Sequence, residues 1–201
     1  MSNTSLWEID KNWSGNIYAE YKNAWLFPPV VWDILMCKYI SKPERTDMYR
    51  THTSFMTWCG FSAQANERHG MLNERINNSE IQYDRVLWEL SNLSVFNFKD
   101  RGFVAECIDK FIEENSHYYD NGIADHIKER FAEIANDIRG LPESCCFFVI
   151  HPTSVDDNVE WWFKETSLSS WDKFVCEFTL IEDNKVIGFS DNLAMCKGEK
   201  Q

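Results

Sequence analysis

Two amphipathic segments between residues 100 and 139 place the strongest constraint on what this chain can fold into. In each segment apolar side chains recur at spacings of three and four residues, as on one face of a helix. The two apolar faces consist of Phe103, Val104, Cys107, Ile108, Phe111 and Ile112 and of Ile123, Ile127, Phe131, Ile134 and Ile138. Because each face needs a partner, we expect a helical hairpin at the core of the fold.

The residues around these segments supply the expected helix ends. Residues 115–122 are polar and end in glycine, which is typical of a loop. Asp100 is a good N-cap for the first helix, and Gly140 followed by Pro142 stops the second. These signals define an architecture and indicate no activity.

Upstream of the hairpin the sequence predicts mostly helix. We expect residues 1–23 to form a short helix or an extended arm over the domain. Pro29 suits the first position of a helix over residues 30–41. Residues 44–67 are also predicted as helix, although threonines and a glycine lower the propensity of this segment.

Two further segments lie between that region and the hairpin. Residues 67–78 are charged and rich in asparagine, so we expect a turn or a short exposed helix. Residues 79–93 are predicted to form a regular helix, because apolar residues gather on one side and Ser79 stands at the cap position.

Beyond the hairpin the pattern changes to that of strands. Residues 145–150 form a continuous apolar run, which is typical of a strand buried on both faces. A second strand is expected at residues 159–163. Residues 173–180 alternate apolar and polar side chains, and residues 185–189 are expected to pair with them across a turn at 182–184.

Together these elements predict an α+β fold, with a helical N-terminal two thirds, a central amphipathic helical hairpin and a small antiparallel sheet at the C-terminus. With 201 residues the chain can bury one sizeable core, and no linker or repeat divides it. We expect a single domain over residues 1–201, helical over about 1–140 and rich in β-structure over about 141–196.

The cysteines and the N-terminus indicate a reducing compartment. The seven cysteines are odd in number and irregular in spacing, so they suggest no disulfide framework. The N-terminus lacks the basic region and apolar run of a secretory signal. The most apolar segment, residues 24–40, is interrupted by prolines and charges and is too short to span a membrane. We therefore expect a cytoplasmic protein.

The net charge of −12 is concentrated in the second half of the chain. Residues 1–99 carry eleven acids and ten bases, residues 100–139 carry ten and five, and residues 140–201 carry eleven and five. This balance argues against direct binding of nucleic acid or of anionic membranes, which need a basic surface. A basic protein is the natural partner for such a charge, although solubility alone also explains an acidic surface.

Acidic residues line the polar sides of both predicted hairpin helices. In the second helix they are spaced by four residues, so that they form a row of like charges that repel one another. Such a row can be retained because it meets a cationic surface, or tolerated as a solvated face. The predicted contacts on the two helices are Glu106, Asp109, Glu113, Asp125, Glu129, Glu133 and Asp137.

A second candidate surface follows the hairpin. Carboxylates beside large aromatic residues are a plausible anchor for a basic partner, since electrostatics govern approach and aromatic burial governs residence. If the two adjacent tryptophans occupy a strand, they face opposite sides and one needs a cover outside the sheet. The candidate contacts are Asp156, Asp157, Glu160, Trp161 and Trp162.

The sequence contains no motif for a cofactor, a metal ion or a catalytic reaction. No ligand spacing typical of zinc or calcium is present, and the glycines form no phosphate-binding loop. Cys59, beside Gly60, is the only cysteine whose context suggests exposure. His52 or His69 is a conceivable base for it, but a packing role fits Cys59 better than that of a nucleophile. We expect no enzyme activity, no cofactor and no metal.

These observations favour an acidic inhibitor that neutralises a basic protein, as immunity proteins and antitoxins neutralise a toxin such as a nuclease. Charge reversal of Glu129, Glu133 and Asp137 is expected to weaken binding without loss of the fold. A phage-type inhibitor that mimics the charge of nucleic acid belongs to the same physical class. The alternatives are a small-molecule-binding protein or enzyme with an aromatic pocket, and a structural subunit whose tryptophans lie in an interface. The oligomeric state does not follow from the sequence.

Overall fold

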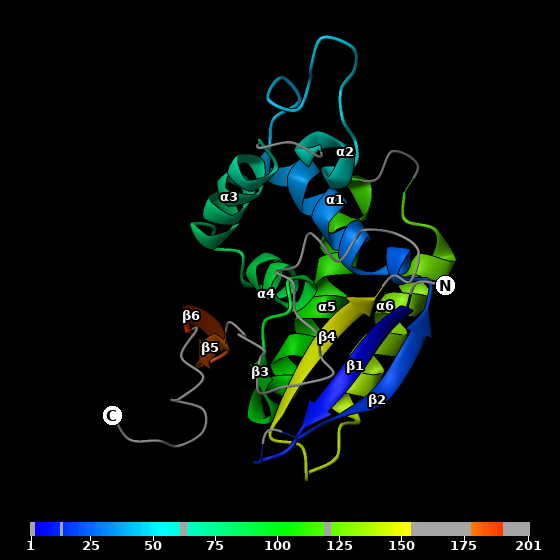
Figure 1. Ribbon diagram of the computed structural model, residues 1–201, viewed down its shortest axis with the longest axis vertical. Helices are drawn as coiled ribbons and strands as arrows, with labels where there is room; N and C mark the ends of the chain where they lie inside the picture. Colours follow the sequence, from blue (N-terminus) through cyan, green and yellow to red (C-terminus); the bar gives the residue numbers. More distant parts are fainter. Residues whose placement is uncertain (1–2, 13, 61–63, 119–121, 154–177, 191–201) are drawn as a thin grey trace.

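The computed structural model describes residues 3–12, 14–60, 64–118, 122–153 and 178–190. These residues form a four-stranded sheet with the order β2-β1-β4-β3, a two-stranded sheet, and helices that lie mainly on one side of the larger sheet (Figure 1). All strand pairs within both sheets are antiparallel, and the predicted α+β class is confirmed. The strands are β1 (Asn3–Ile9), β2 (Gly15–Lys22), β3 (Phe96–Asn97), β4 (Phe147–Thr153), β5 (Phe178–Glu182) and β6 (Lys185–Ser190).

The helices of the described chain fall into two groups. One group precedes β3 in the sequence, and the other lies between β3 and β4. The helices are α1 (Pro28–Tyr39), α2 (Phe55–Cys59), α3 (Gln64–Asn77), α4 (Gln82–Ser91), α5 (Arg101–Asn115) and α6 (Asp125–Arg139), with short 3-10 turns η1 (Ala24–Leu26), η2 (Phe98–Asp100) and η3 (Ser116–Tyr118).

The N-terminal residues form the hairpin β1–β2, not the short helix or extended arm that the sequence suggested. Asp10 shapes its turn, because Oδ1 accepts the backbone N–H of Asn12 at 2.8 Å and of Ser14 at 2.9 Å. On its other side β1 pairs with β4, which places Leu6 opposite Ile150. This pairing with a strand far along the chain stabilises a segment whose own alternation is weak.

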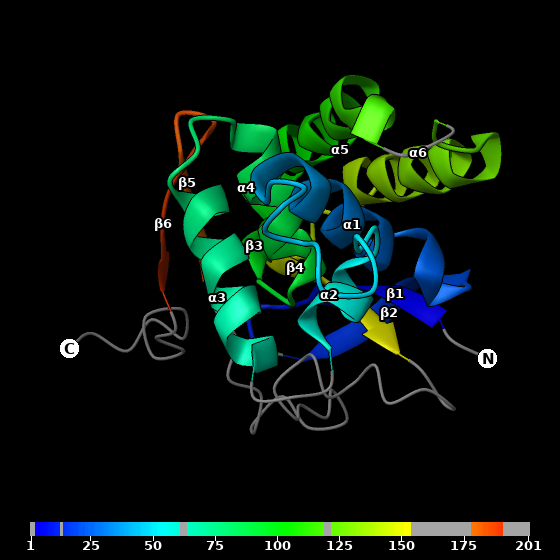
Figure 2. The ribbon, with the colours of Figure 1, turned by 90° about the horizontal axis from the view of Figure 1, so that it is seen from above.

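One face of the larger sheet packs against the α5–α6 hairpin (Figures 1 and 2). Leu6 and Phe148 lie on this face and are fully buried. Tyr21 of β2 lies on the same face and donates its hydroxyl to Asp137 Oδ2 of α6 at 2.8 Å. The predicted helical hairpin is confirmed, and its two helices cover the sheet as well as each other.

Three buried phenylalanines join the α5–α6 hairpin to the start of α1. The rings of Phe111 in α5 and Phe131 in α6 are nearly parallel, with centroids 6.4 Å apart. Phe131 also contacts Phe27, the residue before α1, with a centroid separation of 4.7 Å. The three side chains are at most 1% exposed. Helices that lie far apart in sequence therefore share one aromatic core.

Helix α1 runs through the middle of the helical layer. It begins at Pro28, where a missing backbone N–H removes no helical hydrogen bond. Val31, Trp32, Ile34 and Leu35 are all buried. The helix is thus surrounded on most sides, which explains why its sequence has little amphipathic character.

The predicted helix over residues 44–67 is wrong, and so is the expected short element over residues 67–78. Of the described residues in the first segment, only Phe55–Cys59 and the first turn of α3 are helical, and α3 then continues as a regular helix through most of the second. Leu72 and Ile76 anchor α3 in the core. Trp88 Nε1 of α4 donates to Asn73 Oδ1 of α3 at 2.7 Å. Tertiary contacts therefore stabilise a helix that has only two buried apolar positions near its end.

The C-terminal strand predictions are confirmed where the structure describes them. Residues 148–150 are buried in succession in β4, as expected for a strand covered on both faces. Asp183 and Asn184 adopt positive φ angles of 48° and 57° in the tight turn between β5 and β6. Val186 N–H of β6 donates to Gln82 Oε1 of α4 at 2.7 Å, so the β5–β6 hairpin packs against α4. The expected strand at 159–163 lies outside the described residues.

Candidate functional site

The predicted row of carboxylates lies on the outer side of α6. Asp125, Glu129 and Glu133 are all exposed, and the side chain of Asp125 is 92% exposed. The opposite side of the helix buries Ile127 and Phe131, so the amphipathic sequence itself directs the acids outward. In Figure 2, α5 and α6 form the layer of the molecule that lies opposite β1 and β2.

Helix α5 adds a second set of exposed acids beside the first. Glu106, Asp109 and Glu113 are exposed, because the buried side of α5 holds its apolar residues. Arg139 at the end of α6 forms an ion pair with Asp109, which ties the two helices together at their outer surface. We call this surface the acidic face, and it comprises Glu106, Asp109, Glu113, Asp125, Glu129 and Glu133.

Several of these charges are balanced within the face. Asp109 pairs with Arg139, Lys128 Nζ lies 3.5 Å from Asp125 Oδ1, and Arg130 Nε lies 2.9 Å from Glu133 Oε2. The remaining acids form no ion pair with another described residue. They are Glu106, Glu113 and Glu129, together with Glu114 on the neighbouring side of α5. The uncompensated charge is therefore smaller than the row in the sequence suggests.

Asp137 differs from the other acids of the row. Its side chain is half-buried and accepts the hydroxyl of Tyr21. Burial and this carboxylate raise the pKa of Tyr21 well above its usual value. Arg130 lies over the Tyr21 ring, 5.3 Å from its centroid, and donates to the Lys22 carbonyl at 2.9 Å. Asp137 therefore joins α6 to β2, and charge reversal there would break a structural contact rather than change the surface alone.

The second predicted contact set, Asp156, Asp157, Glu160, Trp161 and Trp162, lies outside the described residues and stays a prediction. Among the tryptophans that the structure describes, most are core residues. The side chains of Trp32, Trp58 and Trp88 are at most 2% exposed, whereas Trp25 is 41% exposed.

The conceivable nucleophile Cys59 is a packing residue. It is fully buried, and burial raises the pKa of its thiol to about 12, so the reactive thiolate is disfavoured. His52 is held by Asp47, with 2.6 Å between Nε2 and Oδ2. His69 packs against the rings of Phe55 and Trp88, with centroids 6.2 and 5.2 Å away.

The structure also contains a buried polar cluster that sequence reasoning missed. Lys38 Nζ of α1 lies 2.7 Å from Asp84 Oδ2 of α4 and donates to Asn115 Oδ1 of α5 at 2.9 Å. Asn115 Nδ2 donates to the other oxygen of Asp84 at 3.2 Å. Tyr39 also donates its hydroxyl to Asp84, at 2.5 Å, and lies 2.8 Å from Ser79 Oγ. Three helices therefore meet at one fully buried carboxylate.

Aromatic rings surround the charged end of Lys38. The ring centroids of Tyr39, Tyr83 and Tyr118 lie 5.8, 5.3 and 6.0 Å from Nζ, within the range of cation–π contacts. The ammonium group, the carboxylate and the amide form hydrogen bonds and an ion pair with one another, so the polar groups of the cluster have their partners within it. It behaves as a structural junction. The signal in the sequence was Asp84, a charged residue beside the apolar positions of a predicted helix.

A half-buried carboxyl group, that of Asp33 in α1, makes stability depend on pH. Burial raises the pKa of Asp33 to about 7, while its Oδ1 accepts the backbone N–H of Phe55 at 2.7 Å. Between about pH 4 and 7 the unfolded chain loses this proton before the folded chain does. The free energy of unfolding therefore falls with rising pH across that window, by at most about 4 kcal/mol for this group.

Asp33→Asn is expected to remove this loss. The amide oxygen still accepts the Phe55 N–H, so the variant should gain stability relative to the wild type as the pH rises from 4 to 7. Denaturant titrations of both proteins at several pH values measure the difference. The difference is the useful quantity, because burial lowers the pKa of His151 to about 4 and this opposes the Asp33 effect in both proteins. A difference that does not change with pH would contradict the assignment.

Comparison of the chain with family models, with curated proteins and with solved structures found no match. Among the described residues, no group of three or more His, Cys, Asp or Glu side chains is placed to hold a metal ion. In that part of the chain every helix is too short or too polar to cross a membrane.

Proposed function

We propose that this protein is an acidic cytosolic inhibitor that binds a basic protein through the acidic face of α5 and α6. It would act as an immunity protein or antitoxin acts on a toxin such as a nuclease. One observation carries the proposal: Glu106, Glu113 and Glu129 are exposed on two adjacent helices and form no ion pair with another described residue.

Such an arrangement gains most from a cationic partner. Like charges on neighbouring helical turns repel by a few tenths of a kcal/mol for each pair at a spacing of four residues. A basic surface relieves this repulsion and is attracted over a distance set by the ionic strength. In a nuclease the basic surface is also where the anionic substrate binds, so an acidic protein on that surface blocks activity.

The test is affinity capture with immobilised protein from lysates of the source cells and of competing strains. Capture is carried out at low salt and again at about 0.5 M salt, where surface charges are strongly screened. The proposal predicts one basic protein in stoichiometric amount, bound less strongly at high salt, whose own activity is inhibited on binding. Capture of no protein, or of an acidic protein whose binding does not respond to salt, would contradict the proposal. A metabolite screen by thermal shift would then test the ligand-binding alternative.

A further inference from the structure

The loop between α1 and α2 carries the two most exposed large apolar side chains of the described residues. Met48 is 83% exposed and Tyr49 is 84% exposed, whereas Ile187, the next most exposed, is at 58%. In Figure 1 this loop projects beyond the helices at the top of the molecule. We call residues 47–50 the tip.

Hydrogen bonds hold the tip in one shape. Asp47 Oδ1 accepts the backbone N–H of Tyr49 at 2.7 Å and of Arg50 at 3.0 Å, and Asp47 N–H donates to the Arg50 carbonyl at 3.0 Å. Hydrogen bonds from the Tyr49 amide, the His52 ring and the Arg50 amide lower the pKa of Asp47 to about 2. The carboxylate is thus ionised at neutral pH and braces the turn.

The base of the loop is also fixed. Thr46 and Thr51 face each other across it, with 2.8 Å between their hydroxyl oxygens. Arg75 of α3 clamps Glu44, with 2.5 Å between Nη2 and Oε1. A backbone that is already fixed in this way loses little conformational freedom on binding, which favours affinity.

The charges that the loop presents outward are positive. The carboxylates of Asp47 and Glu44 are used within the structure, as described above. Lys42 and Arg50 are exposed and form no ion pair with another described residue. In a chain with a net charge of −12, this loop is therefore a local basic site.

We propose that the tip inserts Met48 and Tyr49 into an apolar cleft of another protein, with Arg50 against carboxylates on the rim of that cleft. Tyrosine and arginine are the residue types that dominate binding energy when they are buried at an interface, and methionine adapts to irregular apolar surfaces. The acidic rim follows from charge complementarity with Arg50 and Lys42. The tip and the acidic face lie on different elements, so this inference does not rest on the function proposed above.

A membrane surface is a poorer match for the tip. Binding to anionic lipid needs several basic residues close together or a long amphipathic element, and the loop offers two exposed bases. The strong net negative charge of the whole chain adds repulsion from such a surface.

The first arm of the test is photo-cross-linking in cells that produce the protein. A benzophenone amino acid replaces Met48 or Tyr49 in turn, and Lys11 in the exposed β1–β2 turn as the control. Positions 48 and 49 are expected to give the same protein adduct, and position 11 is expected to give none of it. Mass spectrometry of the adduct then identifies the partner and the attachment site.

The second arm measures affinity of the purified partner for variants of the full chain. Tyr49→Ala is expected to weaken binding at least about thirty-fold, as for the loss of a buried anchor, and Arg50→Glu to weaken it and reduce its salt dependence. Asp47→Ala keeps both apolar side chains and removes the carboxylate that stabilises the turn, so a smaller loss of affinity is expected. Asp10→Ala is the matched control, because Asp10 braces the β1–β2 turn in the same way. Circular dichroism melting curves of all variants establish that each is folded.

Four results would overturn the proposal. The first is the absence of an adduct specific to positions 48 and 49, and the second is a partner whose affinity is the same for Tyr49→Ala and the wild type. The third is an adduct of twice the protein's own mass, which would show pairing of two copies. The fourth is Tyr49-dependent sedimentation with vesicles of phosphatidylcholine and phosphatidylserine, which would show a membrane contact.

Discussion

Replacing Asp84 with alanine is expected to lower the free energy of unfolding by about 3–5 kcal/mol, the range for breaking a buried ion pair. The variant leaves the Lys38 ammonium group, whose side chain is only 12% exposed, without its carboxylate. It also removes the acceptor for Asn115 and Tyr39, so the junction of α1, α4 and α5 loses several hydrogen bonds at once. Urea unfolding followed by tryptophan fluorescence measures the effect.

A double variant separates the charge from the packing at this junction. Lys38→Met with Asp84→Leu removes both charges and fills the space with apolar side chains. Because replacing a whole buried pair is often close to neutral, the double variant should be more stable than Asp84→Ala alone. If Asp84→Ala costs less than about 1 kcal/mol, the cluster is not the structural junction that its geometry indicates.

Replacing Phe131 with alanine is expected to destabilise the fold by about 3–5 kcal/mol, because a large buried ring is lost and a cavity remains. Phe131 contacts Phe27 before α1 and Phe111 in α5, so the loss affects three elements. Thermal and urea unfolding measure the change.

Phe131→Leu serves as the control for this core position, since it keeps most of the apolar volume and should cost markedly less. Equal stability of the alanine variant and the wild type would contradict the placement of Phe131 between α1 and α5. A matched loss in both variants would indicate that the aromatic contacts, not the volume, hold the three elements together.

The elements that could be predicted from the sequence are those whose own periodicity matches their environment. The hairpin α5–α6 has an apolar side in each helix that faces a single neighbouring layer, so spacing alone predicts it. Residues 145–150 form an apolar run because β4 is covered on both faces. The turn at Asp183 and Asn184 follows from residue types that tolerate positive φ.

The predictions that are wrong concern segments whose structure is decided by contacts with distant parts of the chain. The hairpin β1–β2 depends on pairing with β4, which is more than 130 residues away in the register that joins Leu6 to Ile150. The segment 44–67 contains aromatic residues at helical spacing, but polar side chains such as Asp47 bind the backbone and fold a loop instead. In α3, bonds from Arg75 and Trp88 compensate for a weak apolar pattern.

The candidate site also combines features that the sequence predicts with contacts that it does not predict. Exposure of the acids on α5 and α6 follows from the apolar sides of these helices and was predicted. Two contacts depend on tertiary placement. One is the ion pair between Asp109 of α5 and Arg139 of α6, and the other is the hydrogen bond between Tyr21 of β2 and Asp137 of α6. These contacts decide which acids are free for a partner, and no sequence spacing reveals them.

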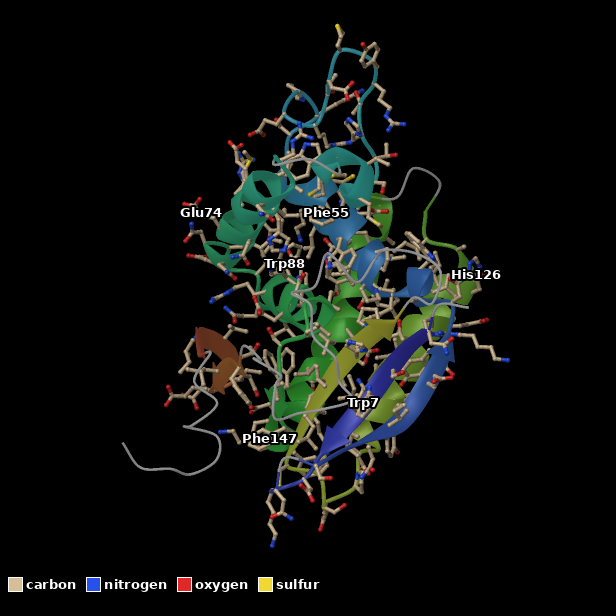
Figure 3. All side chains as sticks on the ribbon, viewed as in Figure 1. Trp7, Phe55, Glu74, Trp88, His126 and Phe147 are labelled. Atoms are coloured by element: carbon tan, nitrogen blue, oxygen red, sulfur yellow. The ribbon has the colours of Figure 1, made fainter. Side chains whose placement is uncertain are left out.

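The affinity of charge-reversed protein for the captured basic protein shows whether the acidic face is the binding site. Glu106, Glu113 and Glu129 are replaced together by lysine, since they form no ion pair with another described residue. In the control variant, lysine replaces Glu67, Glu74 and Glu80. These residues are also exposed but lie in or next to α3. Figure 3 shows Glu74 on the opposite side of the molecule from His126 of α6.

Both variants change the net charge of the chain by the same amount, so a difference between them reports on location. We expect the α5–α6 variant to bind at least about ten-fold more weakly at low salt and to lose most of its salt dependence, whereas the control keeps most of its affinity. Equal affinities of the two variants would show that the partner responds to net charge or to another surface, and the acidic face would not be the binding site.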